Sequence, residues 1–173
     1  MLRRIAVTFY YLKISYLKAM KTSAGILLFK RENNSSYYFL VHPGGPFWKN
    51  KDAGAWSIPK GEVMPDEDPL KRALTEFKEE TGQTVRGKFT ALQPVKQKGG
   101  KTVYAWALES DIELSGLYSN TLLMEWPPKS SKMIEIPEVD QWEWFESEEA
   151  QKRINPAQAA FITELEKILD ETE

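Results

Sequence analysis

The sequence predicts a single domain of the α/β or α+β class. Its 173 residues suit one compact domain rather than two. Extended apolar runs typical of strands occur together with two amphipathic helical patterns, one near residues 69–81 and one at the C-terminal end. Hydrophobic residues make up 42% of the chain and charged residues 28%, which allows a buried core and argues against disorder.

The first two predicted strands form a hairpin. Residues 24–30 (AGILLFK) have the pattern of a buried strand, residues 36–42 (SYYFLVH) that of its partner, and the polar residues 31–35 form the turn. A Gly- and Pro-rich loop that carries an aromatic pair follows at residues 43–54. We expect this loop to be functional, because long loops in compact domains often are.

The second half of the chain adds strands and a final helix. Residues 84–95 are moderately strand-like, and residues 101–109 (KTVYAWALE) predict a strand that is apolar on both faces. Such a strand implies a sheet between two helical layers. A loop opens at Trp126, and the last helix is predicted to begin at Asn155-Pro156, a cap followed by proline. Its buried stripe consists of Phe161, Leu165, Ile168 and Leu169.

Composition excludes several kinds of chemistry. The chain has no cysteine, which rules out disulfides, thiolate nucleophiles and cysteine-based metal sites. It has one histidine, His42, so a two-histidine metal site within one chain is impossible. Metal chemistry would therefore use carboxylate and carbonyl oxygens, which select Mg²⁺, Mn²⁺ or Ca²⁺ over zinc. The net charge of −2 predicts no nucleic-acid and no membrane partner.

The N-terminal residues differ from the rest. They are basic, with no acidic residue before Glu32, and the apolar run at residues 5–11 is too short to span a bilayer. We expect an extension outside the fold at residues 1–19 and one domain at residues 20–173, starting at Met20. A cytoplasmic location is the expectation.

The segment from Gly61 to Gly82 carries the chemistry. Asp68 is a suitable N-cap, Pro69 fits the first turn and Gly82 suits the C-terminal cap, so a helix is predicted over about 69–81. At about 100° per residue, one face of this helix is apolar. That face consists of Leu70, Ala73, Leu74 and Phe77.

Three glutamates, Glu76, Glu79 and Glu80, gather about 120° around the helix from its apolar face. Their charges repel one another, and a divalent cation would compensate for this repulsion. The alternative is an acidic face that is merely solvated, as on many charged helices.

The spacing of this segment closely resembles the signature of the Nudix hydrolase family. That signature is Gly, five residues, Glu, seven residues, then Arg-Glu-aliphatic-any-Glu-Glu-any-Gly-aliphatic. The anchor positions that match are Gly61, Glu67, Glu76, Glu79, Glu80 and Gly82. Three positions depart: Thr75 stands in place of the arginine, Phe77 in place of an aliphatic residue and Gln83 in place of an apolar one. The resemblance implies an α/β/α sandwich with a mixed central sheet and the acidic Nudix helix.

The resemblance also implies roles for the acidic residues. The Gly61 carbonyl and the carboxylates of Glu76, Glu79 and Glu80 would bind Mg²⁺ or Mn²⁺, while Glu76 and Glu79 are the candidate catalytic residues. Glu76 is preferred for orienting or deprotonating the attacking water. Some members use a later carboxylate, for which Glu138 is the first candidate. Its rivals are Glu135, Glu125 and Asp140, and the alternative for all of them is a solvated loop acid.

Supporting roles fall to three further residues. Glu67 and Gly82 are expected to be structural. Thr75 cannot supply a charged fork, but Arg72 lies one turn before Glu76 and is placed to compensate.

The expected substrate is a nucleoside diphosphate linked to another moiety. A dinucleoside polyphosphate such as diadenosine tetraphosphate or a nucleoside triphosphate is favoured, and ADP-sugars remain an alternative. Phe47 and Trp48 are candidates for stacking on a base, Lys60 for binding phosphate and His42 for a lesser phosphate contact. The rival function is a catalytically weak or inactive nucleotide sensor, which only Thr75 favours. A monomer or a homodimer is expected.

Overall fold

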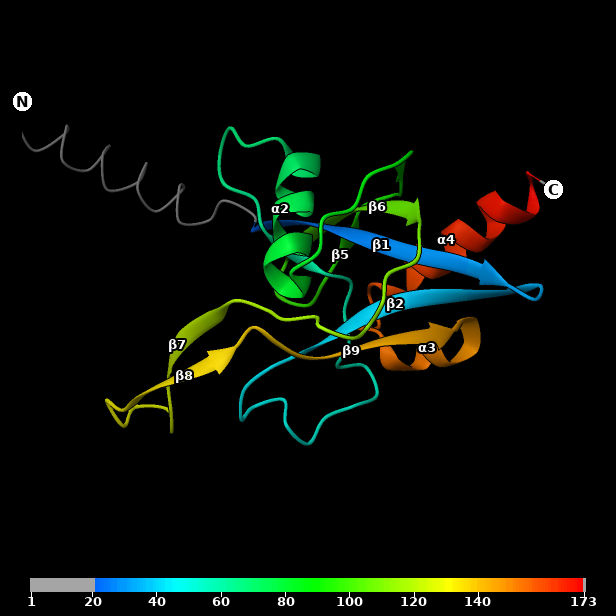
Figure 1. Cartoon of the computed structure of the whole chain (residues 1–173). Coiled ribbons are helices and arrows are strands. Elements are labelled where there is room, and N and C mark those ends of the chain that lie inside the picture. Colours follow the sequence, from blue (N-terminus) through cyan, green and yellow to red (C-terminus); the bar gives the residue numbers. More distant parts are fainter. Residues whose placement is uncertain (1–20, 173) are drawn as a thin grey trace, which may run out of the picture.

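The structure is a computed structural model that describes residues 21–172 (Figure 1). The predicted extension at residues 1–19 lies outside the described residues. Within them, a seven-stranded sheet forms the centre, and a separate two-stranded sheet projects beside it. No helix in this part of the chain is long and apolar enough to cross a membrane.

The elements follow one another in this order. They are β1 (Thr22–Glu32), β2 (Ser35–Pro43), β3 (Lys60–Glu62), α2 (Pro69–Thr81), β4 (Thr90–Ala91), β5 (Val95–Lys96), β6 (Thr102–Glu109), β7 (Thr121–Glu125), β8 (Met133–Pro137), β9 (Val139–Glu146), α3 (Ser147–Arg153) and α4 (Ala159–Asp170).

The central sheet is mixed, as predicted. Its main order is β4-β6-β1-β2-β9, with β3 paired to β1 and β5 paired to β6. The strands β1 and β6 run parallel, while the pairs of β1 with β2 and of β2 with β9 are antiparallel. The expected hairpin of β1 and β2 is present, and its turn uses Asn33 and Asn34 at positive φ angles of 50° and 66°. Asparagine tolerates this backbone region better than most residues do.

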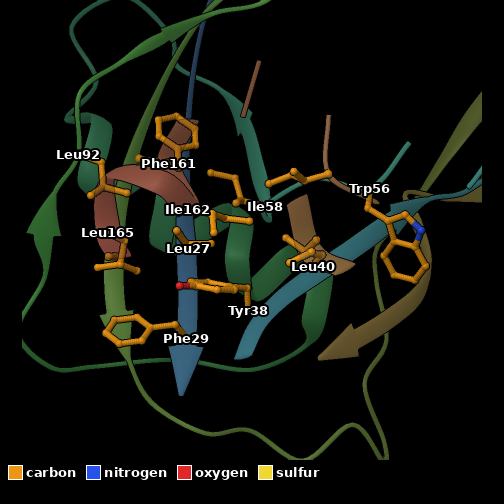
Figure 2. Close-up of a cluster of buried hydrophobic side chains, with 14 of the residues drawn as sticks. Leu27, Phe29, Tyr38, Leu40, Trp56, Ile58, Leu92, Phe161, Ile162 and Leu165 are labelled. Carbon is orange, nitrogen blue, oxygen red and sulfur yellow. The ribbon is translucent and has the colours of Figure 1, made fainter. Parts of the chain in front are cut away.

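One face of the sheet packs against the C-terminal helices. Figure 2 shows this cluster, in which Leu27 and Phe29 of β1 lie near Phe161 and Leu165 of α4. Alternate residues of a strand point to opposite faces, so the same strand presents different side chains to the other side.

The opposite face packs against α2. Ile26 and Leu28 of β1 form a second buried cluster with Ala73 and Phe77 of that helix. Helices therefore cover both faces, and the α/β/α sandwich is confirmed. The strand β6 contributes to both clusters through Ala105 and Leu108, as its two-sided apolar pattern predicts.

The predicted ends of α2 are confirmed. The Asp68 side chain accepts a hydrogen bond from the Lys71 N–H at 2.7 Å, which satisfies one of the free donors of the first turn. Gly82 adopts a left-handed conformation with φ of 73°, and its N–H donates to the Lys78 carbonyl at 2.8 Å.

Other elements differ from the prediction. The hairpin of β7 and β8 and the helix α3 were not anticipated, and residues 84–95 contain little more than β4. The last helix begins at Ala159 instead of Asn155-Pro156. Asn155 caps a separate turn, in which its side chain accepts from the Ala157 N–H at 3.1 Å.

Candidate active site

The site begins where β3 passes α2. Gly61 lies opposite Ala24 of β1, on the face that α2 covers. A Cβ atom at position 61 would overlap the Glu76 carboxyl group. Glycine therefore lets the β3 backbone approach this carboxylate closely, which agrees with the glycine that the family signature has at this position.

Glu76 is a buried carboxylate with a cation beside it. Its side chain is 8% exposed, and it accepts a hydrogen bond from the Arg72 guanidinium. The same guanidinium lies 3.6 Å from a Glu79 oxygen. Burial raises the pKa of Glu76 above its ordinary value, Arg72 opposes this rise, and the charges of Glu79 and Glu138 add to it.

Thr75 occupies the position where the signature has arginine. Its side chain is exposed, and its hydroxyl donates to the Lys71 carbonyl at 3.1 Å. The cation that meets the motif glutamates therefore comes from Arg72, one turn earlier in the same helix.

Glu80 faces the start of β3. Its carboxylate accepts the Lys60 N–H at 3.1 Å. Burial raises the pKa of Glu80 to about 8; Lys60 opposes the rise, and the charges of Glu76 and Glu138 add to it. Glu80 and Glu76 thus belong to one interacting group of carboxylates.

Glu138 joins this group from the junction of β8 and β9. Burial raises its pKa, and the charge of Glu79 raises it further. It borders a depression of about 40 Å³ together with Lys60 and Glu80. The remaining lining residues are Val41, Pro43, Ser57, Ile58 and Val139.

The three rivals of Glu138 make other contacts. Glu135 accepts from the Thr121 hydroxyl at 2.5 Å, and Glu125 accepts from the Ser131 N–H at 2.7 Å. Asp140 is paired with His42. These contacts favour Glu138 as the later carboxylate.

The C-terminal turn of α2 is held by residues that sequence reasoning missed. The Glu79 carbonyl accepts from the Asn120 N–H at 2.8 Å, and the Glu80 carbonyl accepts from the Trp142 indole at 2.7 Å. The Asn120 carbonyl in turn accepts from the Glu138 N–H at 2.9 Å. Asn120 therefore links the backbone at Glu79 to the backbone at Glu138, and no local sequence pattern indicates this connection.

The donor set fits a hard divalent cation, although its side chains are not gathered around one point. Within residues 21–172, no three His, Asp or Glu side chains lie close enough together to hold a metal ion as placed. Glu76 is turned to Arg72 and Glu80 to the Lys60 backbone. All the candidate donors are oxygen atoms. The charges of neighbouring carboxylates add to the raised pKa values of Glu76, Glu80 and Glu138, and a bound cation would oppose this rise.

Comparison with known proteins identifies the family. A family model described as NUDIX domain matches residues 20–165. The chain belongs to the Nudix family. With the motif glutamates and glycines in place, it is a Nudix pyrophosphohydrolase, an enzyme class that acts on nucleotide pyrophosphate bonds. No curated protein matches its sequence.

Solved structures share the Nudix fold at low identity. A Caenorhabditis elegans Ap4A hydrolase in a binary complex is 20% identical, with 88% of this chain and 99% of that chain aligned at a TM-score of 0.62. The NUDIX domain of Shewanella oneidensis NrtR, complexed with ADP ribose, is 15% identical, with 87% and 89% aligned at 0.59. A mutT/nudix family protein from Listeria innocua is 15% identical, with 88% and 95% aligned at 0.59.

Residues 44–54, between β2 and β3, form a loop that we call the aromatic loop. Phe47 is 53% exposed, and its ring meets the Trp48 ring edge-on with centroids 5.0 Å apart. The Lys51 ammonium lies 3.3 Å from the Phe47 centroid and 4.9 Å from the Trp48 centroid. The loop therefore presents an aromatic surface and a cation together.

His42 is buried at the end of β2, next to this loop. Its Nδ1 lies 2.8 Å from an Asp140 oxygen and its Nε2 lies 2.7 Å from the Lys51 carbonyl. Both ring nitrogens are engaged inside the protein, so we do not propose a phosphate contact for His42.

Glu67 acts within the loop before the Nudix helix. Its carboxylate accepts from the Met64 N–H at 3.0 Å. This hydrogen bond closes the turn that leads from β3 to Asp68. Glu67 therefore has a structural contact and is not part of the interacting group of carboxylates.

Proposed function

We propose that this enzyme hydrolyses a pyrophosphate bond in a nucleoside diphosphate linked to another moiety. A dinucleoside polyphosphate such as diadenosine tetraphosphate or a nucleoside triphosphate is the proposed substrate. The observation that carries the proposal is the interacting group of Glu76, Glu79, Glu80 and Glu138 beside the Gly61 backbone. The C. elegans Ap4A hydrolase and the ADP-ribose-bound domain support a substrate of this class.

Mg²⁺ or Mn²⁺ is the proposed cofactor. It would be held by the Gly61 carbonyl together with Glu76, Glu79, Glu80 and Glu138. When bound, such a cation neutralises phosphate charge and lowers the pKa of bound water. The Glu80 side chain would have to turn away from the Lys60 N–H to bind it, and Glu76 would have to turn away from Arg72 if it served as a ligand instead of as the base.

Glu76 is the proposed residue that orients and deprotonates the attacking water, and Glu79 assists it. The oxygen of that water bonds to phosphorus in line with the anhydride bond that breaks, and Glu76 takes up a proton. Because its pKa is raised by burial, Glu76 is a stronger base than an exposed carboxylate. Arg72 keeps it ionised and fixes its orientation.

Substrate binding is proposed for Lys60, Phe47 and Trp48. Lys60 borders the same depression as Glu80 and Glu138, where its ammonium suits a polyphosphate. The exposed aromatic surface of Phe47 and Trp48 suits a base, and each stacked base contributes about 1–3 kcal/mol in other nucleotide-binding proteins.

The test is hydrolysis of a substrate panel by the purified protein with Mg²⁺. The panel contains diadenosine tetraphosphate, nucleoside triphosphates and ADP-ribose, and ion-exchange chromatography separates the products. We expect cleavage at a pyrophosphate link and a loss of at least about 100-fold in kcat in Glu79→Gln and Glu80→Gln, the scale of removing transition-state charge stabilisation.

Lys71→Ala is the matched control for these variants. Its side chain lies exposed on the same helix, so it should retain wild-type activity. A wild type that binds nucleotide without cleaving any member of the panel would support the sensor function instead.

A further inference from the structure

His42 joins three separate parts of the protein. It lies in β2 opposite Gln141 of β9, is 2% exposed and is the only histidine in the chain. Its Nδ1 contacts Asp140 in β9, and its Nε2 contacts the Lys51 carbonyl in the aromatic loop. Its ring also packs edge-on against Trp56, with centroids 5.3 Å apart.

The partners of the ring fix its hydrogen atoms. A backbone carbonyl oxygen and an ionised carboxylate are both acceptors and cannot donate. The Lys51 carbonyl must therefore accept from an N–H at Nε2, which holds the ring in one orientation while Nδ1 faces Asp140.

The other charged groups near the ring are already matched. Asp52 of the aromatic loop accepts from the Trp56 indole at 2.7 Å and is paired with Arg153 of α3. These hydrogen bonds hold the pKa of Asp52 below its ordinary value, and the His42 charge contributes. Arg153 is also bound by Glu149, and the Lys51 ammonium lies over the aromatic rings.

His42 and Asp52 together tie this part of the aromatic loop to the fold, and the bond from His42 is the one that holds the Lys51 backbone. Gly44 donates to the Glu138 carbonyl at 3.0 Å and Gly54 donates to the Lys152 carbonyl at 3.1 Å, so the loop ends are held elsewhere. Apart from the bond to His42, the hydrogen bonds that the described structure gives residues 45–51 all lie within the loop.

Lys51 connects the hydrogen bond of His42 to the exposed aromatic side chains. Its carbonyl is bound by His42, while its ammonium contacts the rings of Phe47 and Trp48. The loop also adjoins the carboxylates, because Pro43 before it and Ser57 after it border the depression with Glu80 and Glu138.

We propose that His42 is a positioning residue whose hydrogen-bonded ring holds the aromatic loop and so orients Phe47, Trp48 and Lys51 for binding a nucleotide. The base would stack on the aromatic rings, and the Lys51 ammonium would face a phosphate. The functional part of this inference rests on the proposed function, whereas the hydrogen bond between the ring and the Lys51 carbonyl does not.

The ring is tested first, by nitrogen-15 NMR of histidine-labelled wild type near neutral pH. A single histidine gives one signal for each ring nitrogen, and their couplings to the ring protons distinguish Nδ1 from Nε2. We expect a directly bonded hydrogen on Nε2, protected from exchange with water by the Lys51 carbonyl. A bare Nε2, or one whose hydrogen exchanges freely, overturns the proposal, whatever the enzyme assay shows.

Kinetics test the positioning role through His42→Phe and His42→Gln. Phenylalanine keeps a ring against Trp56 but has no donor, and glutamine keeps one donor. We expect KM to rise about tenfold in His42→Phe and less in His42→Gln, with kcat within about threefold of wild type, since the loss of a buried hydrogen bond has that scale. An unchanged KM, or a loss confined to kcat, overturns the role.

Ile162→Val is the control for lost stability. Ile162 is buried on the α4 side of the sheet and touches neither the loop nor the acidic cluster, so this variant should lower stability and leave KM unchanged. If the wild type cleaves no substrate, the dissociation constant of diadenosine tetraphosphate replaces KM in the same comparison. Weaker binding in His42→Phe than in Ile162→Val then supports the positioning role although the proposed hydrolysis has failed.

Discussion

Arg72 shows how a single residue can compensate for a departure from the family signature. The guanidinium reaches Glu76 from one turn earlier in α2 and also approaches Glu79. Residues four apart on a helix lie side by side, whereas neighbours in sequence point in different directions. Arg72 is therefore placed to meet Glu76, whereas the exposed Thr75 is not.

Replacing Arg72 by methionine should reduce catalysis and shift its pH dependence. Without the guanidinium, burial raises the pKa of Glu76 further, so the ionised form is reached only at higher pH. We expect kcat to fall between about 10- and 100-fold near neutral pH and to recover partly in alkaline solution, the range that a hydrogen bond to a charged group accounts for. The pH–rate profile measures both effects.

Lys71→Met is the comparison for Arg72→Met, because it removes a cation from the exposed side of the same helix. A pH–rate profile of Arg72→Met that is lowered at every pH without a shift would contradict the assigned role.

Some residue roles can be predicted from the sequence and others cannot. The spacing of the signature indicates Gly61, Glu76, Glu79 and Glu80 because one helix and one turn bring them together. The contacts of His42 involve residues 9 and 98 positions away. Such contacts depend on how β9 and the aromatic loop fold back, which no local pattern specifies.

At the scale of elements, α2 was predictable to the residue because its end signals are local. Asp68, Pro69 and Gly82 act within the helix or one residue beyond it. The elements that were missed depend on distant partners. The hairpin of β7 and β8 packs at its base against Gly45 through Ile136, and α3 covers β2 and β9. The boundary of α4 was wrong because the same Asn-Pro signal caps a turn.

Removing the N-cap of α2 should cost stability without abolishing the chemistry. In Asp68→Ala, the Lys71 N–H loses its acceptor, and we expect the free energy of unfolding to fall by about 1 kcal/mol. Urea denaturation measures this loss. Asp68→Asn retains an acceptor oxygen and should lose less than half as much; equal losses in the two variants would show that the cap is not the source.

At the scale of the whole molecule, the cluster of buried carboxylates makes folding depend on pH. Burial raises the pKa of Glu80 from 4.5 to about 8, while Glu76 and Glu138 are raised as well. At a pH between the unfolded pKa and the folded pKa of such a carboxyl group, the folded protein binds more protons than the unfolded chain does. Stability from this source is complete below the unfolded pKa and is lost as pH rises through the folded pKa.

The metal-free protein should therefore become less stable as pH increases from about 5 to about 8, which is opposite to ordinary acid denaturation. Thermal unfolding in the presence of a chelator, followed across this range, measures the slope. Glu80→Gln cannot ionise, so it should lose much of the slope while remaining folded, because the amide oxygen still accepts from the Lys60 N–H. Glu148→Gln, at an exposed position on α3, should keep the wild-type slope.

If Glu80→Gln retained that slope in full, the desolvation of Glu80 would not be its cause. If Mg²⁺ reversed the slope in the wild type alone, the stability data would connect the same carboxylate to the cation, because a ligand that binds the ionised carboxylates stabilises the fold most where they are ionised.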